Sequence, residues 1–95
     1  MTDMIGKKVV VTTSHRGVFF GTLAEENADS VTLTGCRNCI YWSAKTKGFL
    51  GLTSHGPQAG SRVGPAAKRA KLIEVTSITE CADEAITAWE AEPWS

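Results

Sequence analysis

The sequence predicts a mainly β fold, a small antiparallel β-barrel with a long glycine-rich loop and a short C-terminal α-helix. β-Branched and aromatic runs alternate with turn residues over about residues 5–43 and return over about 68–78. Glycine and proline recur over about 44–67, which predicts the loop. Apolar residues at helical spacing over about 80–92 predict the helix. All 95 residues are expected to form one domain.

Two strands are expected near the N-terminus. The β-branched run within residues 7–12 predicts the first strand, and residues 18–24 predict the second. Between them, Ser14–Gly17 has the composition of a turn, since Gly17 is free to adopt positive φ. Gly21 interrupts the second strand, which indicates a bend or a close approach of another backbone segment, as at a barrel corner.

The next strands follow a polar hairpin loop at residues 25–29. Apolar and polar residues alternate over 30–34, the pattern of a half-buried third strand. We expect a kink at Cys36–Cys39 and a fourth strand at 40–42. The run over 71–78 predicts a single last strand.

The C-terminal helix is expected over 81–92, with Ala85, Ile86 and Trp89 on one face. Ser77 with Glu80, or Thr79 alone, are candidates to cap its N-terminus.

Composition excludes several classes of protein. A hydrophobic fraction of 42% and a charged fraction of 21% are typical of a soluble globular chain. No apolar run approaches the roughly 20 residues of a membrane helix, and the first residues open no signal peptide, so we expect a cytoplasmic protein without membrane contact. Three cysteines cannot all pair internally, which favours reduced thiols.

Charge is unevenly distributed although the net charge is zero. Every charged residue from Ser30 to Ile73 is basic, and every charged residue from Glu74 onward is acidic. This asymmetry indicates an anionic ligand on the basic part or head-to-tail contact between subunits. The alternative is a fold that interleaves the two halves and cancels their fields.

Residues 17–23 followed by 27–33 resemble the first half of an Sm-like or SH3-like small β-barrel, as in ring-forming RNA-binding proteins. The second Sm motif is not recognisable, and the helix follows the barrel instead of preceding it. The resemblance therefore implies a barrel and does not imply the RNA site.

A second resemblance covers most of the chain. Residues 5–9, 17–23, 37–42 and 80–86 resemble a family of uncharacterised small proteins of phage and prophage genomes. The resemblance implies a viral protein acting in the host cell cytoplasm. Small phage barrels of this size often counter host defence by sequestering a signalling nucleotide or by binding a host protein.

The glycine-rich stretch at residues 53–65 is the main ligand candidate, because glycines let backbone N–H groups approach an anion closely. Side chains within it can add donors, and basic residues such as Lys68 can extend the patch. The alternative is a flexible surface loop. The stretch at residues 53–65 lacks the sequence pattern of a nucleotide-binding P-loop and that of a dinucleotide-binding fingerprint.

Arg37 and Tyr41 form the second part of the expected site. The guanidinium can bind phosphate and the ring can stack on a base. We expect both side chains to be partly exposed, with Ile40 and Trp42 in the core. In the alternative, both aromatic residues are core and Arg37 is a solvated strand residue. The complete expected site is Arg37, Tyr41, Ser54, His55, Ser61, Arg62 and Lys68.

Cys36 and Cys39 have the spacing of half a zinc site, but a structural site needs four ligands. Cys81, His15 and His55 stand at no diagnostic spacing. The alternative is two small thiols that pack at a strand bend. Neither a bound metal nor a cofactor is expected, and catalysis is not expected because neither histidine adjoins a nucleophile with a supporting acid.

These observations predict a non-enzymatic, phage-encoded binding protein that sequesters a small anionic ligand, a nucleotide or cyclic nucleotide immune signal. A homo-oligomer is expected, because an open barrel edge, the charge asymmetry and the apolar Trp89 and Trp94 provide surface for pairing. One alternative is a protein–protein interaction module that inhibits a host defence protein or serves as an accessory phage structural protein. Another is an Sm-like RNA-binding protein.

Overall fold

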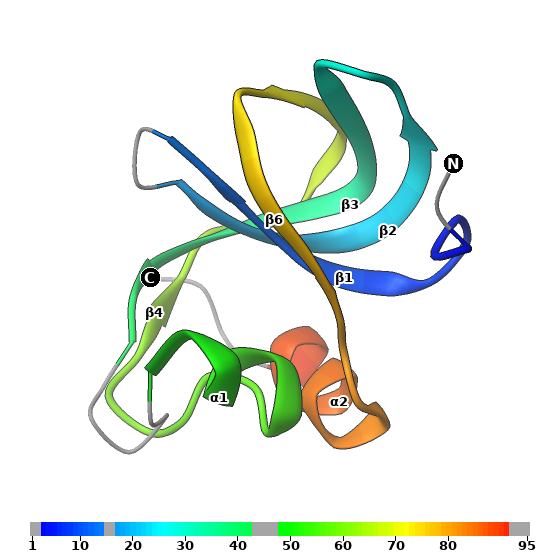
Figure 1. Cartoon of the computed structure of the whole chain (residues 1–95). Coiled ribbons are helices and arrows are strands. Elements are labelled where there is room, and N and C mark those ends of the chain that lie inside the picture. Colours follow the sequence, from blue (N-terminus) through cyan, green and yellow to red (C-terminus); the bar gives the residue numbers. More distant parts are fainter. Residues whose placement is uncertain (1–2, 15–16, 43–47, 92–95) are drawn as a thin grey trace.

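The computed structural model describes residues 3–14, 17–42 and 48–91 (Figure 1). Its elements are β1 (Lys8–Thr13), β2 (Val18–Glu26), β3 (Ser30–Tyr41), α1 (Gly48–Ser54), β4 (Arg62–Val63), β5 (Ala67–Ile73), β6 (Val75–Glu80) and α2 (Asp83–Ala91). All strand pairs are antiparallel, and the predicted mainly β, barrel-like class is confirmed. No helix in the described ranges is long and apolar enough to cross a membrane.

A single kinked segment closes the barrel. The sheet runs β4-β3-β2-β1-β6, and β5 also pairs with β3. Only Glu74, with a positive φ of 53°, separates β5 from β6. β5 pairs with β3, and β6 pairs with β1. The continuous β5–β6 segment therefore joins the two edges of the β1–β2–β3 sheet and closes it into a barrel (Figure 1).

The strand β1 is buried on both faces. Val9 and Val11 belong to one hydrophobic cluster and Val10 to another, as the two-residue period of a strand requires. The first cluster, here the barrel core, fills the inside of the barrel. It contains Val9, Val11, Leu23, Val31, Leu33, Cys36 and Leu72.

The second cluster, here the helix-side core, lies between the outer face of the sheet and the two helices. It contains Val10, Val18, Phe20, Cys39, Leu52, Val63, Cys81, Ala85 and Trp89. Figure 1 shows α1 and α2 together on one side of the barrel, away from the β2–β3 and β5–β6 connections. Trp89 is fully buried, so it is not the exposed pairing surface expected from the sequence, and Trp94 lies outside the described residues.

The helix α2 begins with Asp83 and Glu84, acids that favour a helix N-terminus. Ala85 and Trp89 are its buried face, as the spacing predicts, and Ile86 is partly buried beside it. The predicted cap residues lie instead in β6, which continues to Glu80.

Two strand predictions are wrong. Residues 30–34 and 40–42 were expected as separate strands, but β3 runs continuously from Ser30 to Tyr41. Instead of the expected kink, the pairing of β3 with β2 shifts register near Gly35, which has a φ of +59°. The predicted single strand at 71–78 is divided at Glu74 into β5 and β6.

The close backbone approach predicted at Gly21 is confirmed. A Cβ atom there would lie 3.0 Å from the Thr34 carbonyl oxygen and 3.1 Å from the Leu33 Cβ. These distances leave little room for a side chain between β2 and β3, which suits a glycine at this bend.

The described part of the predicted glycine-rich loop, residues 48–67, contains regular elements and packs against the rest of the protein. It contains α1 and β4, and the expected short turn near residues 49–52 is part of α1. Gly56 has a φ of +80°, and a Cβ atom there would lie 2.5 Å from the Ala88 Cβ. The Ala82 amide also donates to the Thr53 carbonyl at 2.8 Å, so this segment is fastened to α2.

Candidate functional site

Arg37 is a structural residue of the interior. It is only 7% exposed, so the prediction of partial exposure is wrong. Its Nε donates to the Gly64 carbonyl at 2.8 Å and its Nη1 to the Trp89 carbonyl at 2.6 Å. Trp89 lies in the last turn of α2, where carbonyls lack helical partners and a cation is favourable. The guanidinium thus joins β3, the segment after β4 and the end of α2.

Tyr41 and Arg62 are cross-strand neighbours between β3 and β4. Tyr41 is 56% exposed, as expected, but Ile40 is 53% exposed although a core position was predicted. A register shift between Cys39 and Tyr41 interrupts the regular alternation and leaves both Ile40 and Tyr41 at the surface. Trp42 is partly buried against the helix-side core.

The other predicted ligand residues lie elsewhere. Ser54 and His55 are exposed at the end of α1, where His55 Nδ1 is 3.1 Å from Glu84 Oε2. Ser61 lies in a turn in which its amide donates to the Gln58 carbonyl at 3.0 Å. Lys68 is exposed on β5. The structure therefore pairs Tyr41 with Arg62 at the surface, buries Arg37 and distributes the remaining predicted residues over other regions.

The Cys-x-x-Cys pair is divided between the two cores. Cys36 belongs to the barrel core and Cys39 to the helix-side core, so the two thiols serve opposite faces of β3. Cys81 is also buried in the helix-side core, and His15 lies outside the described residues. Within the described ranges, no three His, Cys, Asp or Glu side chains are grouped to hold a metal ion. This arrangement fits the alternative of packed thiols.

Burial disfavours the thiolate form of two of these cysteines. It raises the pKa of Cys36 to about 11 and the pKa of Cys81 to about 12, with the charge of Glu80 contributing to the second. Both thiols therefore stay protonated near neutral pH, where only a thiolate would act as nucleophile or metal ligand.

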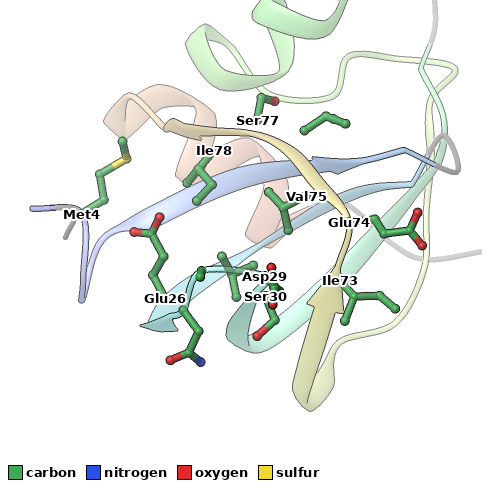
Figure 2. Close-up of a pocket in the computed structure, with 13 residues that line it drawn as sticks. Met4, Glu26, Asp29, Ser30, Ile73, Glu74, Val75, Ser77 and Ile78 are labelled. Atoms are coloured by element: carbon green, nitrogen blue, oxygen red, sulfur yellow. The ribbon is translucent and has the colours of Figure 1, made fainter.

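A hollow lies at the end of the barrel away from the helices, and Figure 2 shows the residues that line it. This mouth pocket has a volume of about 810 Å³. It is lined by Met4, by residues 26–31 of the β2–β3 hairpin and by residues 73–78 around the β5–β6 kink. Segments far apart in the sequence thus form its two walls.

The mouth pocket combines an apolar floor with an acidic rim. Val31, Val75 and Ile78 belong to or pack against the barrel core, and in Figure 2 Val75 and Ile78 point from β6 toward the hairpin. The charged residues that line the pocket are Glu26, Asp29 and Glu74, all exposed and all acidic.

The rim residue Glu74 is held in place by the neighbouring turn. Its side chain accepts a hydrogen bond from Ser14 Oγ at 2.9 Å, and its carbonyl accepts one from the Ser14 amide at 2.9 Å. The kink therefore has a defined position relative to the β1–β2 connection.

Sequence reasoning missed this pocket. It identified residues 25–29 as a polar hairpin loop, but nothing local shows that this loop faces the β5–β6 kink. In Ile73-Glu74-Val75, an acid interrupts a β-branched run. Glutamate is only weakly depleted in strands, so this acid also fits an exposed position of one continuous strand and does not by itself predict the break.

Comparison with known proteins gives a family and no activity. No curated protein and no solved structure matches the chain significantly. Residues 6–89 match the family model described as a domain of unknown function, DUF6948. Since this match spans most of the chain, the protein belongs to the DUF6948 family.

Proposed function

We propose that this protein is a non-enzymatic binding module whose mouth pocket holds a basic side chain of a partner protein. One observation carries the proposal: the described charged residues that line this hollow with its apolar floor are all acidic and exposed. A volume of about 810 Å³ lies within the usual range of ligand pockets.

The chemistry of lysine and arginine fits this combination. Their methylene stems pack on apolar surface while their charged ends stay near water. A stem lying on Val75 and Ile78 would bring the charge toward Glu26 and Asp29. A phosphate group in the same place would face only carboxylates among the charged lining residues, which disfavours an anionic ligand at the mouth.

The charges at the mouth therefore favour the interaction-module alternative over the anion-sequestering one. The viral origin and the role against host defence remain predictions from the resemblance. Protein binding is compatible with them, since one of the expected partners is a host protein.

Two features support a role without catalysis. The buried Cys36 and Cys81 have raised pKa values and are protonated near neutral pH. His55 contacts Glu84 on the helical side of the molecule and does not line the mouth pocket.

Fluorescence anisotropy with labelled valine-flanked tripeptides tests the proposal. The central residue is lysine, arginine, norleucine or glutamate. We expect the lysine and arginine peptides to bind, the norleucine peptide to bind more weakly and the glutamate peptide not to bind. The Glu26→Gln/Asp29→Asn double variant should lose the preference for the basic peptides, because it removes two rim charges.

Glu84→Gln is the control, since it removes an exposed carboxylate on α2, outside the mouth pocket. It should bind the basic peptides as the unaltered protein does. Equal affinity for the lysine and glutamate peptides, or an unchanged preference in the double rim variant, would reject the mouth pocket as a cation site.

A further inference from the structure

The outer face of β5 carries basic side chains that lie outside the mouth pocket. Ala70 and Leu72 point toward the barrel core, so Arg69 and Lys71 point outward, and both are exposed. Neither of these two cations forms an ion pair with another residue of the described ranges. Their charges are therefore available to a ligand.

Strand register places hydroxyl groups beside these cations. Arg69 lies opposite Thr34 and Lys71 opposite Thr32 on β3. Directly opposite residues in an antiparallel pair project from the same face of the sheet. Thr22 on β2 lies opposite Thr34 and extends the row. Arg69, Lys71, Thr22, Thr32 and Thr34 together are called the basic threonine face.

This face contains a depression bordered by residues of β2, β3 and β5. The depression has a volume of about 430 Å³ and is lined by Arg69, Lys71, Thr32 and Glu25. Among the described residues, two cations and one carboxylate thus border it. None of these residues lines the mouth pocket.

We propose that the basic threonine face binds a phosphate-bearing ligand. A guanidinium can contact two phosphate oxygens at once, and an ammonium supplies a compact charge to a neighbouring oxygen. The Thr32 hydroxyl can donate to the same group. Arg69 and Lys71 lie two residues apart on one strand, roughly 6.6 Å along its axis, so one ligand can span both.

The ligand is recognised through its phosphates. Among the described residues, the lining of the depression contains no aromatic side chain on which a base could stack, and the depression lies on an open sheet face. The same chemistry occurs in the backbone of a single-stranded nucleic acid and in a free nucleoside triphosphate, and the test separates these sources.

The test measures binding of fluorescein-labelled oligothymidylate over a series of salt concentrations, with unlabelled nucleoside triphosphate as competitor. We expect the Arg69→Gln/Lys71→Gln variant to bind on the order of tenfold more weakly or worse at low salt. The slope of log affinity against log salt should fall by about 1.4, since each lost phosphate contact on a single strand contributes about 0.7. Full displacement by nucleoside triphosphate would assign the site to free nucleotides, and its failure to compete would assign it to the strand.

Two further variants keep the result interpretable. Lys7→Gln removes an exposed charge outside the face and should leave both affinity and slope unchanged. Glu25→Gln removes the carboxylate in the depression and should strengthen binding, which damage to the fold would not do. Unfolding temperatures of all variants are measured in parallel. Absence of binding to either ligand, or equal binding by the double variant and the unaltered protein, would overturn the proposal.

Discussion

Trp89 of α2 stacks on Phe20 of β2, with ring centroids 4.9 Å apart and planes 5° from parallel. The same tryptophan donates its indole Nε1–H to the Leu52 carbonyl at 3.0 Å and accepts a hydrogen bond from Arg37 at its own carbonyl. One residue thus fastens the C-terminal helix to the sheet, to α1 and to β3.

Replacement of Trp89 by alanine should therefore be strongly destabilising. We expect a loss of about 3–5 kcal/mol in the free energy of unfolding, the usual cost of truncating a large buried aromatic side chain. Urea denaturation followed by circular dichroism measures it. Leu50→Ala is the control, because Leu50 is 63% exposed on α1 and should change stability by less than about 0.5 kcal/mol. Similar effects of the two substitutions would contradict the described helix-side core.

Replacement of Gly56 by alanine should lower the free energy of unfolding. Alanine there must adopt a positive φ and also overlap Ala88. Gly35→Ala is a matched control, since Gly35 has a φ of +59° but no atom within 4 Å of the added Cβ. We expect about 1–2 kcal/mol for Gly35→Ala from backbone strain. Gly56→Ala should cost about 1–3 kcal/mol more from overpacking. Equal costs in thermal unfolding would show that Gly56 does not pack on α2.

Arg37→Lys should destabilise the end of α2. An ammonium group cannot reproduce the fork that reaches both the Gly64 and Trp89 carbonyls. A buried carbonyl left without its donor costs about 1–3 kcal/mol. Hydrogen exchange should accelerate at amides in the last turn of α2, whereas Arg69→Lys on the exposed face of β5 should leave it unchanged. Unaltered exchange in the Arg37 variant would assign this arginine a role other than fastening the helix.

The buried thiols predict a loss of stability at alkaline pH. The pKa values of Cys36 and Cys81 are raised to about 11 and about 12, above the ordinary value of 9.0. As pH rises past that ordinary value, the unfolded chain releases these protons before the folded chain does. The contribution of the two protonated thiols to the free energy of unfolding is therefore complete below about pH 9. It is lost as pH rises through the pKa values of the folded state.

Urea midpoints measured between neutral and alkaline pH test this linkage. The Cys36→Ala/Cys81→Ala variant should have a lower midpoint throughout and a shallower alkaline decline. The native thiols should also react with a thiol reagent only after unfolding. Rapid reaction of all three cysteines in the folded protein would contradict their burial.

Local patterns predicted most of the secondary structure because those patterns are themselves local. Alternation around Val9–Val11 and the helical spacing of Ala85 and Trp89 depend on neighbours a few residues away. The break at Glu74 escaped prediction because the surrounding run continues the β pattern on both sides. Only pairing of β5 and β6 with different strands makes it necessary.

The candidate sites could not be predicted in the same way. Arg37 was expected to be partly exposed, and its burial escaped prediction because its partners, the Gly64 and Trp89 carbonyls, lie 27 and 52 residues away in the chain. The mouth pocket likewise requires the β2–β3 hairpin to face the β5–β6 kink. In contrast, the basic residues Lys68, Arg69 and Lys71 were visible as a patch in the sequence, and the structure adds the threonines opposite Arg69 and Lys71.

The most direct test of the central claim is a nuclear magnetic resonance titration of the isotopically labelled protein with the lysine-centred tripeptide. We expect saturable shifts at residues 26–31 and 73–78, with much smaller shifts for the glutamate-centred peptide. Shifts concentrated on α1 and α2, or none in either wall of the mouth pocket, would contradict that claim.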